Sequence, residues 1–188
     1  MQIVTNKSQK ELKEHGSYQF PILVSRECLS GYETGSFFWH WHPEVELTLV
    51  TEGVIEYHVN GSVFILKEGQ ALFGNANSLH SGNMVEGQDG HYISITFDPR
   101  LVYGSENSLI YEKYVMPVVL DGAPRGVVLA GSQDWHDEMV GLIRGIIEAY
   151  DSQADGYEME ITGKILHFWQ LLVLNVDRKR GISPREQK

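Results

Sequence analysis

The chain has 188 residues, of which 42% are apolar, and it carries a formal net charge of −10 at pH 7. This size and composition suffice for one well-buried domain, whereas the acidic balance argues against this chain alone wrapping nucleic acid, because phosphate binding needs a clustered positive surface. The sequence has no apolar stretch of the roughly 18 residues that a membrane span requires, and its polar N-terminus lacks the apolar core of a signal peptide. We therefore expect a soluble, cytoplasmic protein with no membrane partner, and the lone cysteine, Cys28, suits a reducing compartment.

Short apolar runs separated by turn residues extend from about residue 20 to residue 97, a pattern typical of an antiparallel sandwich or barrel. Asn60-Gly61 predicts a tight hairpin between the segments VIEYHV and SVFIL, since both central residues of a type I′ turn need a positive φ. Further strands are expected at residues 20–24, 36–42, 45–51, 70–73 and 91–97. Segments such as ELTLV are apolar on both faces, so another layer should cover the outside of the barrel.

The pattern changes to a helical period after residues 121–131, which are rich in Gly, Pro and Asp and are expected to form a loop. Ser132 is the expected N-cap of an amphipathic helix, and a second helix should begin at about Tyr157 with a wider apolar face. The main apolar positions at helical spacing are Met139, Leu142, Ile143, Ile146, Ile147 and Tyr150, followed by Ile161, Ile165, Phe168, Trp169, Leu172 and Val176.

The two helices should pair as an antiparallel hairpin, through a turn near Asp155-Gly156. The hairpin could cap the barrel, or it could meet a second copy of the chain. Because the apolar faces look too wide for one partner, we expect a homodimer through these helices.

A basic tail ends the chain. Residues 178–188 contain five of the 15 basic residues, together with Gly181 and Pro184, and show no apolar periodicity. This composition is typical of a linker.

A group of histidines and one glutamate points to a metal site. In a strand, His40 and His42 would project to the same face about 6.7 Å apart along the chain. Pro43 cannot sit in the middle of a paired strand, so a turn there can bring Glu46 back beside them. His80 would complete the set from another strand. Three imidazoles and a carboxylate suit zinc, iron, nickel and manganese about equally.

These residues carry a resemblance to the cupin family. The pattern HxHxxxExxxxxxG, filled by His40, His42, Glu46 and Gly53, resembles the first cupin motif, and His80 follows Gly69 at the spacing of the second. The resemblance implies a mainly β fold, a double-stranded β-helix or jelly roll. Thr34 replaces the first motif's opening glycine, and Asn75 and Asn77 replace the second motif's proline and glycine, which argues against a typical cupin enzyme.

A wider resemblance covers the whole chain. The phrases HWHPEVELTLVTEGVIEYHVNG and LFGNANSLHSG, and the order barrel, loop, helical hairpin and basic linker, resemble the N-terminal half of AraC-type transcriptional regulators. The resemblance implies an effector-binding barrel with an N-terminal arm at residues 1–125 and a dimerisation hairpin at 132–177. Residues 178–188 would then begin a linker to a helix-turn-helix domain absent from this chain, through which alone DNA would be contacted.

The leading hypothesis is therefore a non-enzymatic sensor domain that binds a small effector, with a sugar or sugar derivative as the expected class. Sugar C–H faces could stack on Trp41, Tyr57, Phe73 and Tyr92, while His40, His42, Glu46 and His80 hold a divalent metal or bind hydroxyls. The main alternative is a metal-dependent cupin enzyme, such as a dioxygenase, isomerase or decarboxylase, with open positions on the ion. A carbohydrate-binding module without regulation is a third hypothesis.

Overall fold

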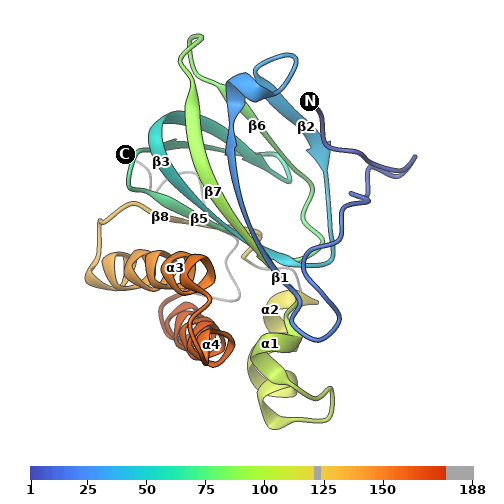
Figure 1. Cartoon of the computed structure of the whole chain (residues 1–188), viewed down its shortest axis with the longest axis vertical. Coiled ribbons are helices and arrows are strands. Elements are labelled where there is room, and N and C mark those ends of the chain that lie inside the picture. The colour runs from blue at the N-terminus through green and yellow to red at the C-terminus, as the bar shows by residue number, and fades with distance from the viewer. Residues whose placement is uncertain (121–123, 177–188) are drawn as a thin grey trace.

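The computed structural model describes residues 1–120 and 124–176. It shows a barrel of antiparallel strands with two long helices packed beneath one side (Figure 1). The strands are β1 (Ile22–Cys28), β2 (Ser36–His40), β3 (Val45–Val59), β4 (Ser62–Lys67), β5 (Ala71–Gly74), β6 (His80–Met84), β7 (Gly90–Phe97) and β8 (Gly126–Leu129). The expected fold, a jelly-roll barrel followed by an antiparallel helical hairpin, is confirmed.

The long strand β3 belongs to both sheets of the barrel. Its first half pairs with β5 and β7, in a sheet ordered β1-β7-β3-β5-β8, and its second half pairs with β4 and β6, with β2 outside β6. Gly53 lies at the corner between the halves with a φ of +75°, where a Cβ would collide with the carbonyl oxygen of Asp89. The glycine of the first motif is thus required by the bend between the two sheets.

The predicted hairpin turn is confirmed. Asn60 and Gly61 join β3 to β4 with φ values of +44° and +87°, as a type I′ turn needs. The predicted strand positions also hold, with ends shifted by a few residues, except that residues 45–51 and the segment VIEYHV form one continuous strand, β3. A strand carrying His80 was expected without bounds and is β6, whereas β8 was not predicted. Gly126–Leu129 was expected to be loop, and it forms β8 because it pairs with the whole of β5.

Helices α3 (Asp134–Ser152) and α4 (Tyr157–Asn175) cover the outside of the larger sheet. The layer that was expected to cover the strands with two apolar faces is therefore the helical hairpin. Alternate residues of β3 divide between the two cores: Leu47 and Leu49 pack toward the helices, while Val50 faces the barrel interior. Ser132 does not cap α3, whose N-cap is Gln133.

Most of the helical side chains that suggested a dimer interface lie inside the protein. Met139, Ile143, Ile146, Ile161 and Ile165 are each fully buried in the core shared with the sheet. The helices have many apolar positions because each helix packs both against the other helix and against the barrel. These positions therefore belong to the intramolecular core, and a dimer would have to use other residues.

The segment between β7 and β8 precedes the loop predicted at residues 121–131, and no element was predicted for it. It forms α1 (Arg100–Tyr103), a π-helix at Tyr111–Val115 and α2 (Met116–Val119). Asn75, which stands where the second cupin motif has a proline, fixes this segment by donating hydrogen bonds to the carbonyl oxygens of Val118 and Pro124 at 2.8 and 3.0 Å. The predicted linker at 178–188 lies outside the described residues. Within the described residues, no helix is both long and apolar enough to cross a membrane.

Candidate functional site

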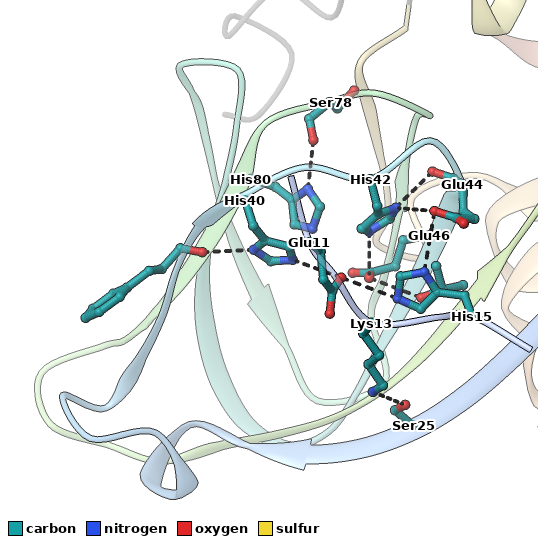
Figure 2. Close-up of polar contacts among 12 residues, drawn as sticks. Glu11, Lys13, His15, Ser25, His40, His42, Glu44, Glu46, Ser78 and His80 are labelled. Atoms are coloured by element: carbon teal, nitrogen blue, oxygen red, sulfur yellow. Dashed lines mark hydrogen bonds and ion pairs between the residues drawn. The ribbon is translucent and has the colours of Figure 1, made fainter. Parts of the chain in front are cut away.

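Three of the predicted ligands meet at one end of the barrel (Figure 2). His40 ends β2 and lies directly across the strand pair from His80, the first residue of β6. His42 follows β2 in the turn that leads into β3. One ring nitrogen from each histidine lies within 4.8 Å of the others, and all three residues are buried.

Backbone carbonyls orient these imidazoles. Nδ1 of His40 donates to the carbonyl oxygen of Phe38 at 2.8 Å, and Nδ1 of His80 donates to that of Ser78 at 2.8 Å. Nδ1 of His42 lies 3.2 Å from the carbonyl oxygen of Glu44. Because a carbonyl can only accept, Nδ1 carries the proton and Nε2 keeps its lone pair in each neutral ring.

The free nitrogens of two of these rings make no hydrogen bond with the protein. Nε2 of His42 and Nε2 of His80 are buried and make no hydrogen bond, an arrangement that is costly unless a cation or water lies between them. Burial and the neighbouring imidazole of His40 lower the pKa of His80 to about 3, and burial also lowers the pKa of His40. Both rings are therefore neutral at pH 7, the form that coordinates metals.

Glu46, the fourth predicted ligand, lies beside the three histidines but outside the group whose ligand atoms are all within 4.8 Å of one another. One of its carboxylate oxygens lies 3.5 Å from Nε2 of His42, and the other accepts hydrogen bonds from the Tyr57 hydroxyl at 2.7 Å and the Thr48 hydroxyl at 3.0 Å. Burial opposes ionisation, but the contacts with His42, His80 and Tyr57 outweigh it and hold the pKa of Glu46 well below its usual range. Glu46 is thus ionised at pH 7.

A cavity of about 460 Å³ opens beside the cluster. Its wall includes His40 and Glu46, and the hydroxyls of Tyr32 and Tyr92 lie 3.1 Å apart within it. The other lining residues come from β1, β2, β7 and the N-terminal segment: Met1, Gln2, Ile3, Val4, Glu11, Leu12, Lys13, His15, Ser25, Glu27, Phe37, Ser94 and Thr96.

The four predicted effector-binding aromatics do not share one site. Tyr92 lines the cavity, and Tyr57 lies behind it against Glu46. Phe73 instead faces the helices, with its ring centroid 6.4 Å from that of Phe168, and Trp41 faces the N-terminal segment, where its indole nitrogen donates to the carbonyl oxygen of Ser8. We therefore retain only Tyr57 and Tyr92 in the candidate site.

The N-terminal segment adds residues that the sequence analysis did not single out. His15 lies 3.3 Å from a carboxylate oxygen of Glu11 and 3.4 Å from one of Glu44, and its ring centroid is 5.1 Å from that of His42. Burial disfavours protonation of His15, but the two carboxylates outweigh it and raise its pKa to about 9. No local motif marks these residues, because only the path of the folded chain brings them to the barrel.

The family model described as the AraC-like ligand binding domain matches residues 24–168, which include all of the barrel strands except the first two residues of β1, and most of the hairpin. The chain belongs to this family. A relative from Bacillus subtilis (strain 168), described as the uncharacterized HTH-type transcriptional regulator YdeC, is 28% identical over 172 residues. The alignment covers 92% of this AraC-like chain and 58% of YdeC, so the chain spans little more than half the length of that relative.

Partial likenesses to solved structures accompany this match. A cupin-like protein from Thermotoga maritima MSB8 is 26% identical, with a TM-score of 0.38, over 42% of this chain and 58% of its own. A predicted oxalate decarboxylase from Thermotoga maritima is 24% identical, with a TM-score of 0.36, over 40% and 64% of the two chains.

The residues of the cluster fit a divalent transition-metal ion. Ring nitrogens of three imidazoles lie within 4.8 Å of one another, and the ionised Glu46 supplies negative charge beside them. A gap of about 10 Å³, roughly the room for one water or ion, is lined in part by His42, Glu46, Tyr57 and His80. The hydrogen bonds to Nδ1 are the outer contacts that commonly fix metal-binding histidines.

Proposed function

We propose that this AraC-like domain is the sensor half of a transcriptional regulator and binds a small hydroxylated effector in the barrel cavity. The observation that carries this proposal is the cavity itself, whose volume of about 460 Å³ lies in the range of small-molecule sites. Family membership favours a sensor over the metal-dependent enzyme. DNA binding would belong to a further domain outside this chain, as the description of YdeC suggests.

The lining of the cavity suits a sugar or sugar derivative. The hydroxyls of Tyr32, Tyr92, Ser94 and Thr96 and the carboxylate of Glu27 can exchange hydrogen bonds with a polyhydroxylated ligand. Phe37 offers an apolar ring face among them. A site with several polar groups on an aromatic base can recognise hydroxyl positions while covering C–H surface.

The proposal includes one divalent transition-metal ion at His40, His42, His80 and Glu46. When bound, such an ion supplies positive charge that polarises an oxygen of a nearby ligand. The protein side chains orient the site and exclude bulk water, since the cluster is buried and touches the cavity only through His40 and Glu46. Zinc, iron, nickel and manganese are the candidate ions.

Effector binding can be tested by calorimetry and thermal shift with a panel of monosaccharides, sugar acids and sugar phosphates, using metal-loaded protein. We expect one chemical class to bind saturably, and Tyr92→Phe to weaken it about tenfold, since one hydrogen bond to a buried group is lost. Tyr18→Phe, at a residue that is 86% exposed, is the matched control. The carbohydrate assignment is contradicted if no member of the panel binds at millimolar concentration.

The proposed dimer uses the outer face of α4. Met159, Leu166 and Leu174 are 81%, 39% and 72% exposed, and their spacing places them on one side of the helix. Gly163 lies on the same side, and a Cβ there would meet open space, so a second helix could approach closely. A two-fold interface would bring the same stripe from both copies together.

Leu166→Glu should convert this dimer into a folded monomer. An unpaired charge in the apolar dimer contact costs several kcal/mol, whereas the same charge exposed to solvent on the monomer costs little. Light scattering with circular dichroism measures both properties. Val63→Glu, at a 48% exposed position on β4, is the control and should remain dimeric. A wild-type protein that is monomeric at high micromolar concentration would rule out the dimer.

A further inference from the structure

The N-terminal segment is fixed beside the metal-binding cluster by backbone pairing. The Trp41 amide donates to the carbonyl oxygen of Gln9 at 3.0 Å, and the Glu11 amide donates to the carbonyl oxygen of Trp41 at 2.9 Å. Trp41 stands between His40 and His42 in the sequence. The segment is therefore attached to the residue that separates two of the candidate ligands, which fixes its register relative to them.

This register brings a second carboxylate to the cluster. Oε2 of Glu11 lies 4.0 Å from Nε2 of His40, and the Glu11 side chain is only 9% exposed. Figure 2 shows the Glu11 carboxylate between the rings of His40 and His15. Two ligand atoms that each lie about 2.1 Å from a shared ion can be up to about 4.2 Å apart. The spacing of Glu11 and His40 is therefore compatible with one ion between them.

Other observations also favour a ligand at this point. Nε2 of His42 and Nε2 of His80 lie in the cluster and make no hydrogen bond, and these residues are 3% and 5% exposed. Glu46 alone leaves a divalent ion with one uncompensated positive charge in a buried site, which is unfavourable. A second carboxylate makes the set of ion and ligands neutral. His15, 3.3 Å from the same Glu11 oxygen, can hold that carboxylate in place.

We propose that Glu11 of the N-terminal segment is a ligand of the divalent ion, in addition to His40, His42, His80 and Glu46. This inference rests on the metal site of the proposed function. The ion would then be bound by two parts of the chain that are distant in sequence, the barrel strands and the N-terminal segment. Occupancy of the site would consequently hold the segment against the barrel.

The test compares Glu11→Gln with the wild-type chain and with Glu14→Gln, which makes the same change of charge at an exposed residue of the same segment. Each protein is stripped of metal and titrated with Co²⁺ and Zn²⁺ against a competing chelator. We expect Glu11→Gln to weaken binding at least about tenfold, to alter the visible spectrum of bound Co²⁺, and to leave the circular dichroism unchanged. Glu14→Gln should match the wild type.

Limited proteolysis gives a readout independent of affinity. Trypsin can cut after Lys10 and Lys13, on either side of Glu11. Added Zn²⁺ should slow these cuts in the wild type and in Glu14→Gln, but not in Glu11→Gln. If Glu11→Gln binds the ions with wild-type affinity and spectrum, Glu11 is not a ligand and the inference is wrong. If the wild type itself binds neither ion, the metal site of the proposed function fails, and this inference fails with it.

Discussion

Replacing Ile143 with glutamate is expected to unfold the protein or to leave it only marginally folded. Ile143 lies in the middle of α3 and is fully buried in the core between the helices and the larger sheet. A carboxylate at this position would have no charged partner among apolar neighbours, at a cost of about 4 kcal/mol or more. That cost is a large part of the ~5–15 kcal/mol by which a domain is ordinarily stable.

Thermal and urea unfolding followed by circular dichroism measure this effect. The control is Gly141→Glu, which places the same carboxylate two residues earlier on α3, where a Cβ meets open space. Gly141→Glu should unfold at or above the wild-type temperature, because glycine is a poor helix former. A soluble, folded monomer from Ile143→Glu would mean instead that this face of α3 meets a second chain.

The barrel and its histidine cluster could be predicted because their signals are local. His40, His42 and Glu46 lie within seven residues, a strand with a proline break fixes how they project, and Asn60-Gly61 fixes a hairpin. These features depend on backbone geometry near each residue. His80 comes from a distant strand; it was expected as the ligand that completes the set, and the resemblance to the second cupin motif supported its position.

The sequence could not show in the same way which neighbouring layer, the barrel interior or the helices, each side chain would face. Phe73 lies in β5, which is buried on both faces, so its sequence shows no alternation that would separate the side facing the barrel from the side facing the helices. The helical residues assigned to a dimer were misplaced for the same reason. Glu11 and His15 carry no local signal, since they lie 25 to 31 positions before His40 and His42 in the sequence.

His42→Ala is expected to lower the affinity for a divalent transition metal by more than about a hundredfold. It removes one of three imidazoles whose ring nitrogens lie within 4.8 Å of one another, and losing even an outer partner of such a site costs about ten- to a hundredfold. Added metal should therefore raise the melting temperature of the wild type but not of the variant. His167→Ala, at a half-exposed histidine on α4, is the control and should keep wild-type binding.

Elemental analysis of the wild-type protein, purified without a histidine tag and compared with His42→Ala, tests the metal-bearing sensor site most directly. The arrangement of His40, His42, His80 and Glu46 predicts about one equivalent of zinc, iron, nickel or manganese per wild-type chain and little in the variant. A wild-type content below about a tenth of an equivalent, with no uptake on titration, would contradict the site.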